Sequence, residues 1–195
     1  FKSARLLSGL SLQDVADRVS KSLTRQAIYR YEKGEVVPDS KLLAELSTLF
    51  NVRPDFFFRE TKVEIGNVEY RRLVMPAKEE HKIEEQTKDY LSRYLELENI
   101  LGIAEAFEHP LKNFKVVSTY SDVNEAANQL REKWDLGAHA LSNIAEMLED
   151  KGIKIVKLSA SGEFDGLQTF ANGSIPVIAY NEQKSMCKER IRFTL

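Results

Sequence analysis

Polar side chains with the chemistry to read DNA bases recur within nine residues near the start of the chain: Arg25, Gln26, Tyr29, Arg30 and Lys33. If this segment is a helix, Ala27, Ile28 and Tyr31 form an inward stripe and the polar side chains point outward. Arginine can pair with O6 and N7 of guanine, and glutamine with N6 and N7 of adenine. The spacing therefore predicts a helix that enters the major groove of duplex DNA.

A second short helix is predicted just before this one. Its apolar face consists of Leu12, Val15, Ala16 and Val19. Ser11 and Thr24 are N-cap residue types, one before each helix. Two such helices around a tight turn form a helix-turn-helix. Arg18 and Lys21 lie between them and are candidates for phosphate contacts at the rim of the interface.

Charge is distributed unevenly along the chain, whose formal net charge is −2. Residues 1–34 hold seven basic and three acidic side chains, so the predicted DNA-binding segment carries +4 and the remainder −6. Because binding to DNA requires cations that neutralise phosphates, this asymmetry directs DNA to the N-terminal surface.

The composition is that of a folded protein, with 195 residues of which 43% are hydrophobic. The apolar runs are far shorter than the roughly 20 residues of a membrane span, and no signal segment opens the chain, so we expect a cytoplasmic protein without membrane contact. Cys187 is the single cysteine and cannot form an intrachain disulfide. His81, His109 and His139 lack metal-ligand spacing, so structural or surface roles are expected.

Hydrophobic periodicity predicts an α+β fold that is mainly α. Five short helices are expected near residues 2–8, 12–19, 25–33, 40–50 and 54–58. An alternating segment at 63–73 predicts short strands or an extended linker. Further helices are expected at 78–107, 122–134 and 140–150, strands at 153–158, 167–171 and 176–180, and the start of a helix at 185–195. Asn172-Gly173 marks a hairpin between the last two strands.

These elements divide the chain into three predicted parts: residues 1–60, a helix-turn-helix domain; 61–110, a linker with a long amphipathic helix; and 111–195, an α+β domain with a small sheet. The apolar stripe from Ile83 to Leu101 fits either a dimer seam or a helix packed on its own domain. The run Phe56 to Phe58 fits closure of the first core, and part of it could support dimerisation. Gly162 and Asp165-Gly166 lack the pattern of a phosphate loop and indicate a turn.

The first 60 residues resemble the Xre-type helix-turn-helix domain of phage-repressor-like regulators. The likeness rests on Leu10-Ser11 followed by Val15-Ala16, and on the run from Ile28 to Gly34. It implies a five-helix lambda-repressor-like fold, an ion pair between Arg5 and Glu32, and a phosphate contact at Thr24. This family often has Gln where Leu12 stands, so the neighbouring Gln13 is the candidate for that backbone contact. The implied DNA-contacting set is Gln13, Thr24, Arg25, Gln26, Ala27, Tyr29, Arg30 and Lys33.

Residues 61–195 look like the spacer and front portion of ImmA/IrrE-type metallopeptidase proteins. The segments that carry this likeness are 63–66 with 70–71, 90–98, 176–181 and 189–195. In that family the next residues begin a zinc helix with a His-Glu-x-x-His motif, which these 195 residues lack. No catalytic residue, metal ligand or cofactor is therefore expected within them, although the resemblance implies zinc in an intact protein.

The leading hypothesis is a transcriptional regulator, a repressor that binds a double-stranded operator as a homodimer, with a C-terminal sensing or peptidase-like region. One alternative is a zinc metallopeptidase that cleaves a repressor or toxin partner, with its active site beyond residue 195. A second alternative is an antitoxin that covers a protein partner.

Overall fold

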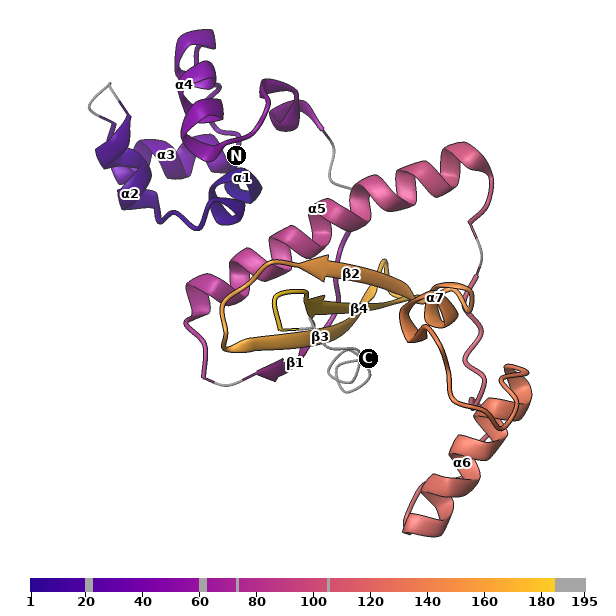
Figure 1. Cartoon of the computed structure of the whole chain (residues 1–195). Coiled ribbons are helices and arrows are strands. Elements are labelled where there is room, and N and C mark those ends of the chain that lie inside the picture. Colours follow the sequence, from indigo (N-terminus) through magenta and orange to yellow (C-terminus); the bar gives the residue numbers. More distant parts are fainter. Residues whose placement is uncertain (20–22, 60–62, 73, 105, 185–195) are drawn as a thin grey trace.

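The computed structural model describes residues 1–19, 23–59, 63–72, 74–104 and 106–184 (Figure 1). The fold is α+β and mainly helical, with one small sheet, as predicted. The expected helix at 185–195, Cys187 and Lys21 lie outside the described residues. Among the described helices, none combines the length and the apolar character that a membrane span requires.

The N-terminal unit consists of α1 (Lys2–Leu7), α2 (Leu12–Arg18), α3 (Arg25–Glu32), α4 (Ser40–Phe50) and a closing 3₁₀ helix, η1 (Pro54–Phe58). Its core contains Ala4, Val15, Ile28, Leu42 and Leu46, all nearly inaccessible to solvent. These helices form because each contributes an apolar face at helical spacing to one shared core. All five begin and end within about two residues of the predicted bounds.

The aromatic run that follows α4 divides its side chains between the core and solvent. Phe56 and Phe57 pack against the core of the N-terminal unit, and the ring of Phe57 stacks on that of Phe1 at 4.5 Å between centroids. Phe58 is 75% exposed. The prediction that this run closes the first core is confirmed for two of its three rings.

The sheet has the strand order β1-β3-β4-β2 and is mixed. Its strands are β1 (Glu69–Arg72), β2 (Lys154–Leu158), β3 (Phe164–Ala171) and β4 (Ile175–Asn181). β3 pairs antiparallel with β1 and β4, whereas β2 runs parallel to β4. Asn172 and Gly173 both have positive φ, as the predicted hairpin turn requires.

The long helix α5 (Ala77–Leu101) covers one face of this sheet. Ile83 and Leu91 are fully buried against Val156, Phe164 and Val177 of the strands. The prediction of a helix to residue 107 was wrong at its end, because Gly102 adopts a left-handed conformation, and the N–H of Ile103 bonds back to the carbonyl of Glu98 at 3.1 Å.

The apolar stripe of α5 is buried only in its first two thirds. Leu97 and Leu101 are 59% and 63% exposed, whereas Leu95 still packs against the core of the sheet, so α5 packs on its own domain as far as Leu95 and leaves its end open to solvent. The dimer-seam alternative stays a prediction for that end alone.

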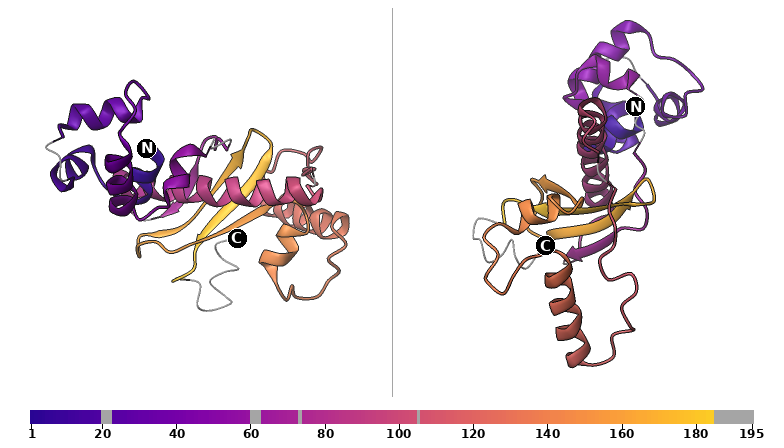
Figure 2. Two further views of the ribbon diagram at one scale, coloured as in Figure 1. Left: turned by 90° about the horizontal axis from the view of Figure 1, so that it is seen from above. Right: turned by 90° about the vertical axis from the view of Figure 1, so that its right-hand side faces the viewer.

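Two helices follow at the far end of the molecule from α1–α4 (Figures 1 and 2). α6 (Tyr120–Lys133) begins at a capping box of Thr119 and Asp122 and buries none of its residues. α7 (Ile144–Glu149) packs beside β2 through Leu148 and Ile155. The predicted helix at 140–150 starts four residues late because the side chain of Asn143 caps it, accepting from the N–H of Glu146 at 3.3 Å.

Candidate nucleic-acid interface

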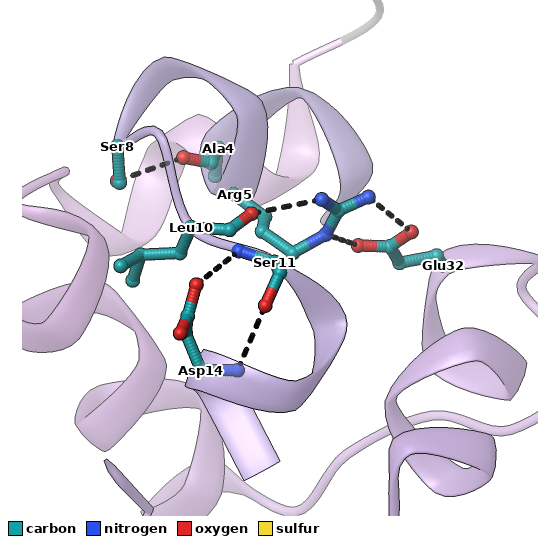
Figure 3. Close-up of polar contacts among 7 residues, drawn as sticks. All are labelled: Ala4, Arg5, Ser8, Leu10, Ser11, Asp14 and Glu32. Atoms are coloured by element: carbon teal, nitrogen blue, oxygen red, sulfur yellow. Dashed lines mark hydrogen bonds and ion pairs between the residues drawn. The ribbon is translucent and has the colours of Figure 1, made fainter. Parts of the chain in front are cut away.

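The two helices of the predicted DNA-binding motif each begin at a side-chain cap. The hydroxyl of Ser11 accepts from the N–H of Asp14 at 3.1 Å, and the carboxylate of Asp14 accepts from the N–H of Ser11 at 2.7 Å (Figure 3). The hydroxyl of Thr24 accepts from the N–H of Ala27 at 3.1 Å. These bonds satisfy donors that a helix start leaves free, so Thr24 fixes the N-cap of α3 and the helix begins at Arg25.

An ion pair between α1 and the end of α3 holds the motif together. Arg5 donates from Nε and Nη2 to the two carboxylate oxygens of Glu32, at 2.6 and 3.1 Å, and from Nη1 to the carbonyl of Leu10 at 2.9 Å (Figure 3). Both charged side chains are nearly buried, with 11% and 6% exposure. The implied Arg5–Glu32 pair is therefore confirmed, and it fixes α3 relative to α1.

The outer side of α3 carries the side chains that the sequence assigned to DNA. Arg25, Gln26, Arg30 and Lys33 are exposed, as is Tyr29 at 46%. Ile28, on the opposite side, is 4% exposed and belongs to the core. Ala27 and Tyr31 are only partly buried, so the predicted inward stripe is centred on Ile28.

The exposed side chains of α3 differ in whether they contact other described residues. Neither Arg25 nor Gln26 is held by a hydrogen bond or an ion pair to another described side chain, so both are available to a ligand. Arg30 instead pairs with Glu35 at 3.4 Å, and Lys33 lies 5.6 Å from the centroid of the Tyr29 ring.

At the rim, Gln13 is exposed and donates one N–H of Nε2 to Asp17 at 2.7 Å, and its amide has a second N–H that a contact with the DNA backbone could use. Arg18 is also exposed. The carboxylate of Asp14 lies 3.5 Å from Lys78 of α5, a contact that joins α2 to the rest of the chain. Bonds from Ser11 hold the pKa of Asp14 below its ordinary value, so this carboxylate stays charged at neutral pH.

Comparison with known proteins identifies this unit. Residues 1–57 match a family model described as helix-turn-helix, of the Xre type. Residues 1–57 are a helix-turn-helix domain. The match implies DNA binding and confirms the first of the two resemblances. No curated protein and no solved structure matches the chain.

The match ends before the sheet, so the ImmA/IrrE resemblance of residues 61–195 stays a prediction. Within the part of the chain that the structure describes, no three His, Cys, Asp or Glu side chains gather as metal ligands would. Gly162 lies in a turn and Gly166 in β3, so the interpretation of this glycine pair as a turn fits Gly162 only.

Proposed function

We propose that this protein is a sequence-specific transcriptional regulator that reads an operator through α3 of its helix-turn-helix domain. The observation that carries the proposal is the exposed first turn of α3, where Arg25 and Gln26 have no described partner. Arg25 supplies the fork of donors that guanine accepts, and Gln26 supplies the donor and acceptor pair that adenine matches. Thr24, Gln13 and Lys33 contact phosphates, and Tyr29 and Arg30 contact the neighbouring bases.

The bound form we propose is a homodimer on a two-fold operator, acting as a repressor. One short helix contacts few base pairs, and two copies about 34 Å apart would read half-sites one helical turn apart. The part of the chain after the helix-turn-helix domain then serves as the sensing region. No described contact favours the metallopeptidase or the antitoxin alternative, so neither is proposed.

Selection of bound sequences from a random DNA pool, followed by titration at fixed salt, tests this function. We expect Arg25→Ala and Gln26→Ala each to lose about 1–3 kcal/mol on the selected site while binding to random DNA is nearly unchanged. Asn124→Ala, an exposed change on α6, is the matched control and should not alter either affinity. Equal losses on selected and random DNA would refute the base-reading roles.

A further inference from the structure

A cleft of about 820 Å³ lies where the helix-turn-helix domain meets α5 and the end of β2. Its walls include Asn51 to Arg53 after α4 and Lys157 to Ser159 at the end of β2. From α5 the lining residues are Lys82, Gln86, Asp89, Tyr90 and Arg93. A smaller hollow of about 250 Å³ shares Phe56, Arg59 and Arg93 with it. The cleft is within the size range of small-molecule sites.

The charges around this cleft are mostly positive. Its lining holds five basic side chains and three acidic ones, which leaves a net charge of +2. The basic side chains are Arg53, Arg59, Lys82, Arg93 and Lys157, and the acidic ones are Asp55, Asp89 and Glu182. A phosphate monoester carries about −1.5 to −2 charges at neutral pH, so its charge matches that of the lining.

Three guanidinium groups are already positioned there. Arg53 and Arg59 share the carboxylate of Asp55, at 3.3 and 2.9 Å, so two cations have one anion between them. Arg93 pairs with Asp89 at 2.7 Å. Each guanidinium has five N–H donors in a planar fork, and these contacts leave several of them free for a further acceptor.

We propose that this cleft binds a phosphorylated small molecule, whose phosphate is held by Arg59 and Arg93 with support from Arg53 and Lys82. A phosphate has the three oxygens that forked guanidinium donors can engage in pairs. Lys82 makes no ion pair with another described residue, so its ammonium group is available to the same anion. A neutral compound would leave this excess of positive charge without a counterion.

The position of the cleft gives its occupant a regulatory role, which rests on the proposed function. Arg53 and Arg59 belong to the helix-turn-helix end of the chain, whereas Lys82 and Arg93 belong to α5. An anion held by residues of both the helix-turn-helix end and α5 binds best at one distance between these two parts. Because a ligand shifts a conformational equilibrium by its difference in affinity for the two conformations, the bound anion favours the arrangement with that distance. Ligand and operator are therefore coupled, and each changes the affinity for the other by the same factor.

Calorimetric titration of the DNA-free chain tests the site with three probes: inorganic phosphate, adenosine monophosphate and adenosine. We expect the two phosphate-bearing probes to bind with dissociation constants of about 1 mM or lower, and adenosine not to bind. The double variant Arg59→Gln/Arg93→Gln should weaken both by at least about tenfold, because it removes the forked donors. Lys41→Gln, an exposed change on α4 outside the cleft, should bind as the unmodified chain does.

The proposal is overturned if neither phosphate-bearing probe binds, if adenosine binds as tightly as its monophosphate, or if Lys41→Gln weakens binding as much as the double variant. Duplex titration of the same samples separates this failure from failure of the proposed function. If the chain binds the operator but not phosphate, only the proposed cleft site is refuted. If it binds phosphate but not the operator, the site is supported and its proposed regulatory role is refuted.

Discussion

Replacing Arg5 by methionine tests how much the buried ion pair contributes to the helix-turn-helix domain. The change keeps an aliphatic chain over the same space but leaves the carboxylate of Glu32, only 6% exposed, without its counterion. It also removes the donor to the carbonyl of Leu10. Removal of one partner of a buried pair typically costs 3–5 kcal/mol, because the remaining charge stays desolvated.

The pair here is bidentate and both partners are almost inaccessible, so we expect a loss of about 3 kcal/mol in the free energy of unfolding of this domain. Since every 1.4 kcal/mol is tenfold, amide hydrogens of α1 and α3 that exchange through opening of the domain should exchange about two orders of magnitude faster. Native-state hydrogen exchange resolves this local effect, which the stability of the remaining chain would mask in a global melt.

Two further variants make the reasoning refutable. Glu35→Gln breaks the ion pair with Arg30, in which the side chain of Glu35 is 54% exposed and that of Arg30 is 56% exposed. It should change the free energy of exchange by less than about 1 kcal/mol. Arg5→Met/Glu32→Leu removes both charges and should be less destabilised than Arg5→Met alone. If Arg5→Met costs no more than Glu35→Gln, or if the double variant is the least stable, the ion pair does not hold α3 in place.

Two more predictions concern the rest of the chain. Leu91→Ala should lower the free energy of urea unfolding, followed by circular dichroism, by about 2–5 kcal/mol, because Leu91 is fully buried between α5 and the sheet. Leu97→Ala, on the exposed end of the same helix, should cost less than about 1 kcal/mol, and similar losses would contradict the assigned packing. At the start of α6, Lys115 and the N–H groups of Ser118 and Thr119 depress the pKa of Asp122. The stabilisation is therefore present above about pH 4 and is lost as the pH falls through the lower folded pKa. The protection of α6 amides, measured relative to their intrinsic exchange rate at each pH, should fall in this acid range, and Asp122→Asn should remove this pH dependence; an unchanged acid response in the variant would contradict the assignment.

Local signals explain why the helix-turn-helix domain could be predicted closely from sequence. Ser11 and Thr24 cap the two helices that they were expected to precede, Asp39 caps α4, and each cap is a bond between residues three positions apart. The apolar spacing of these helices then defines one buried face each. Fold class and helix bounds follow from interactions that lie within single segments.

Interactions between distant segments explain what the sequence did not reveal. The pairing of β1 with β3 joins residues about a hundred positions apart, and periodicity alone left 63–73 as either strand or linker. The exposure of Leu97 and Leu101 also depends on a distant segment. Their helical spacing matches that of Leu91, but the core of the sheet covers Leu91 and does not cover Leu97 or Leu101. The contact of Asp14 with Lys78 also joins segments that no local pattern connects.

The contacts between α1, α3 and α5 indicate how the two ends of the molecule could communicate. Glu32 at the end of α3 is held by Arg5 of α1, and α1 packs against α5. α5 in turn contributes Ile83 and Leu91 to the core under the sheet. Because α1 and α3 also share the core of the N-terminal unit, a change in the placement of α1 on α5 moves α3 with it as long as this core and the Arg5–Glu32 pair hold. Loss of the pair removes one of these links, so it should weaken the coupling between operator binding and a signal received at α5 while Arg25 and Gln26 still bind duplex DNA.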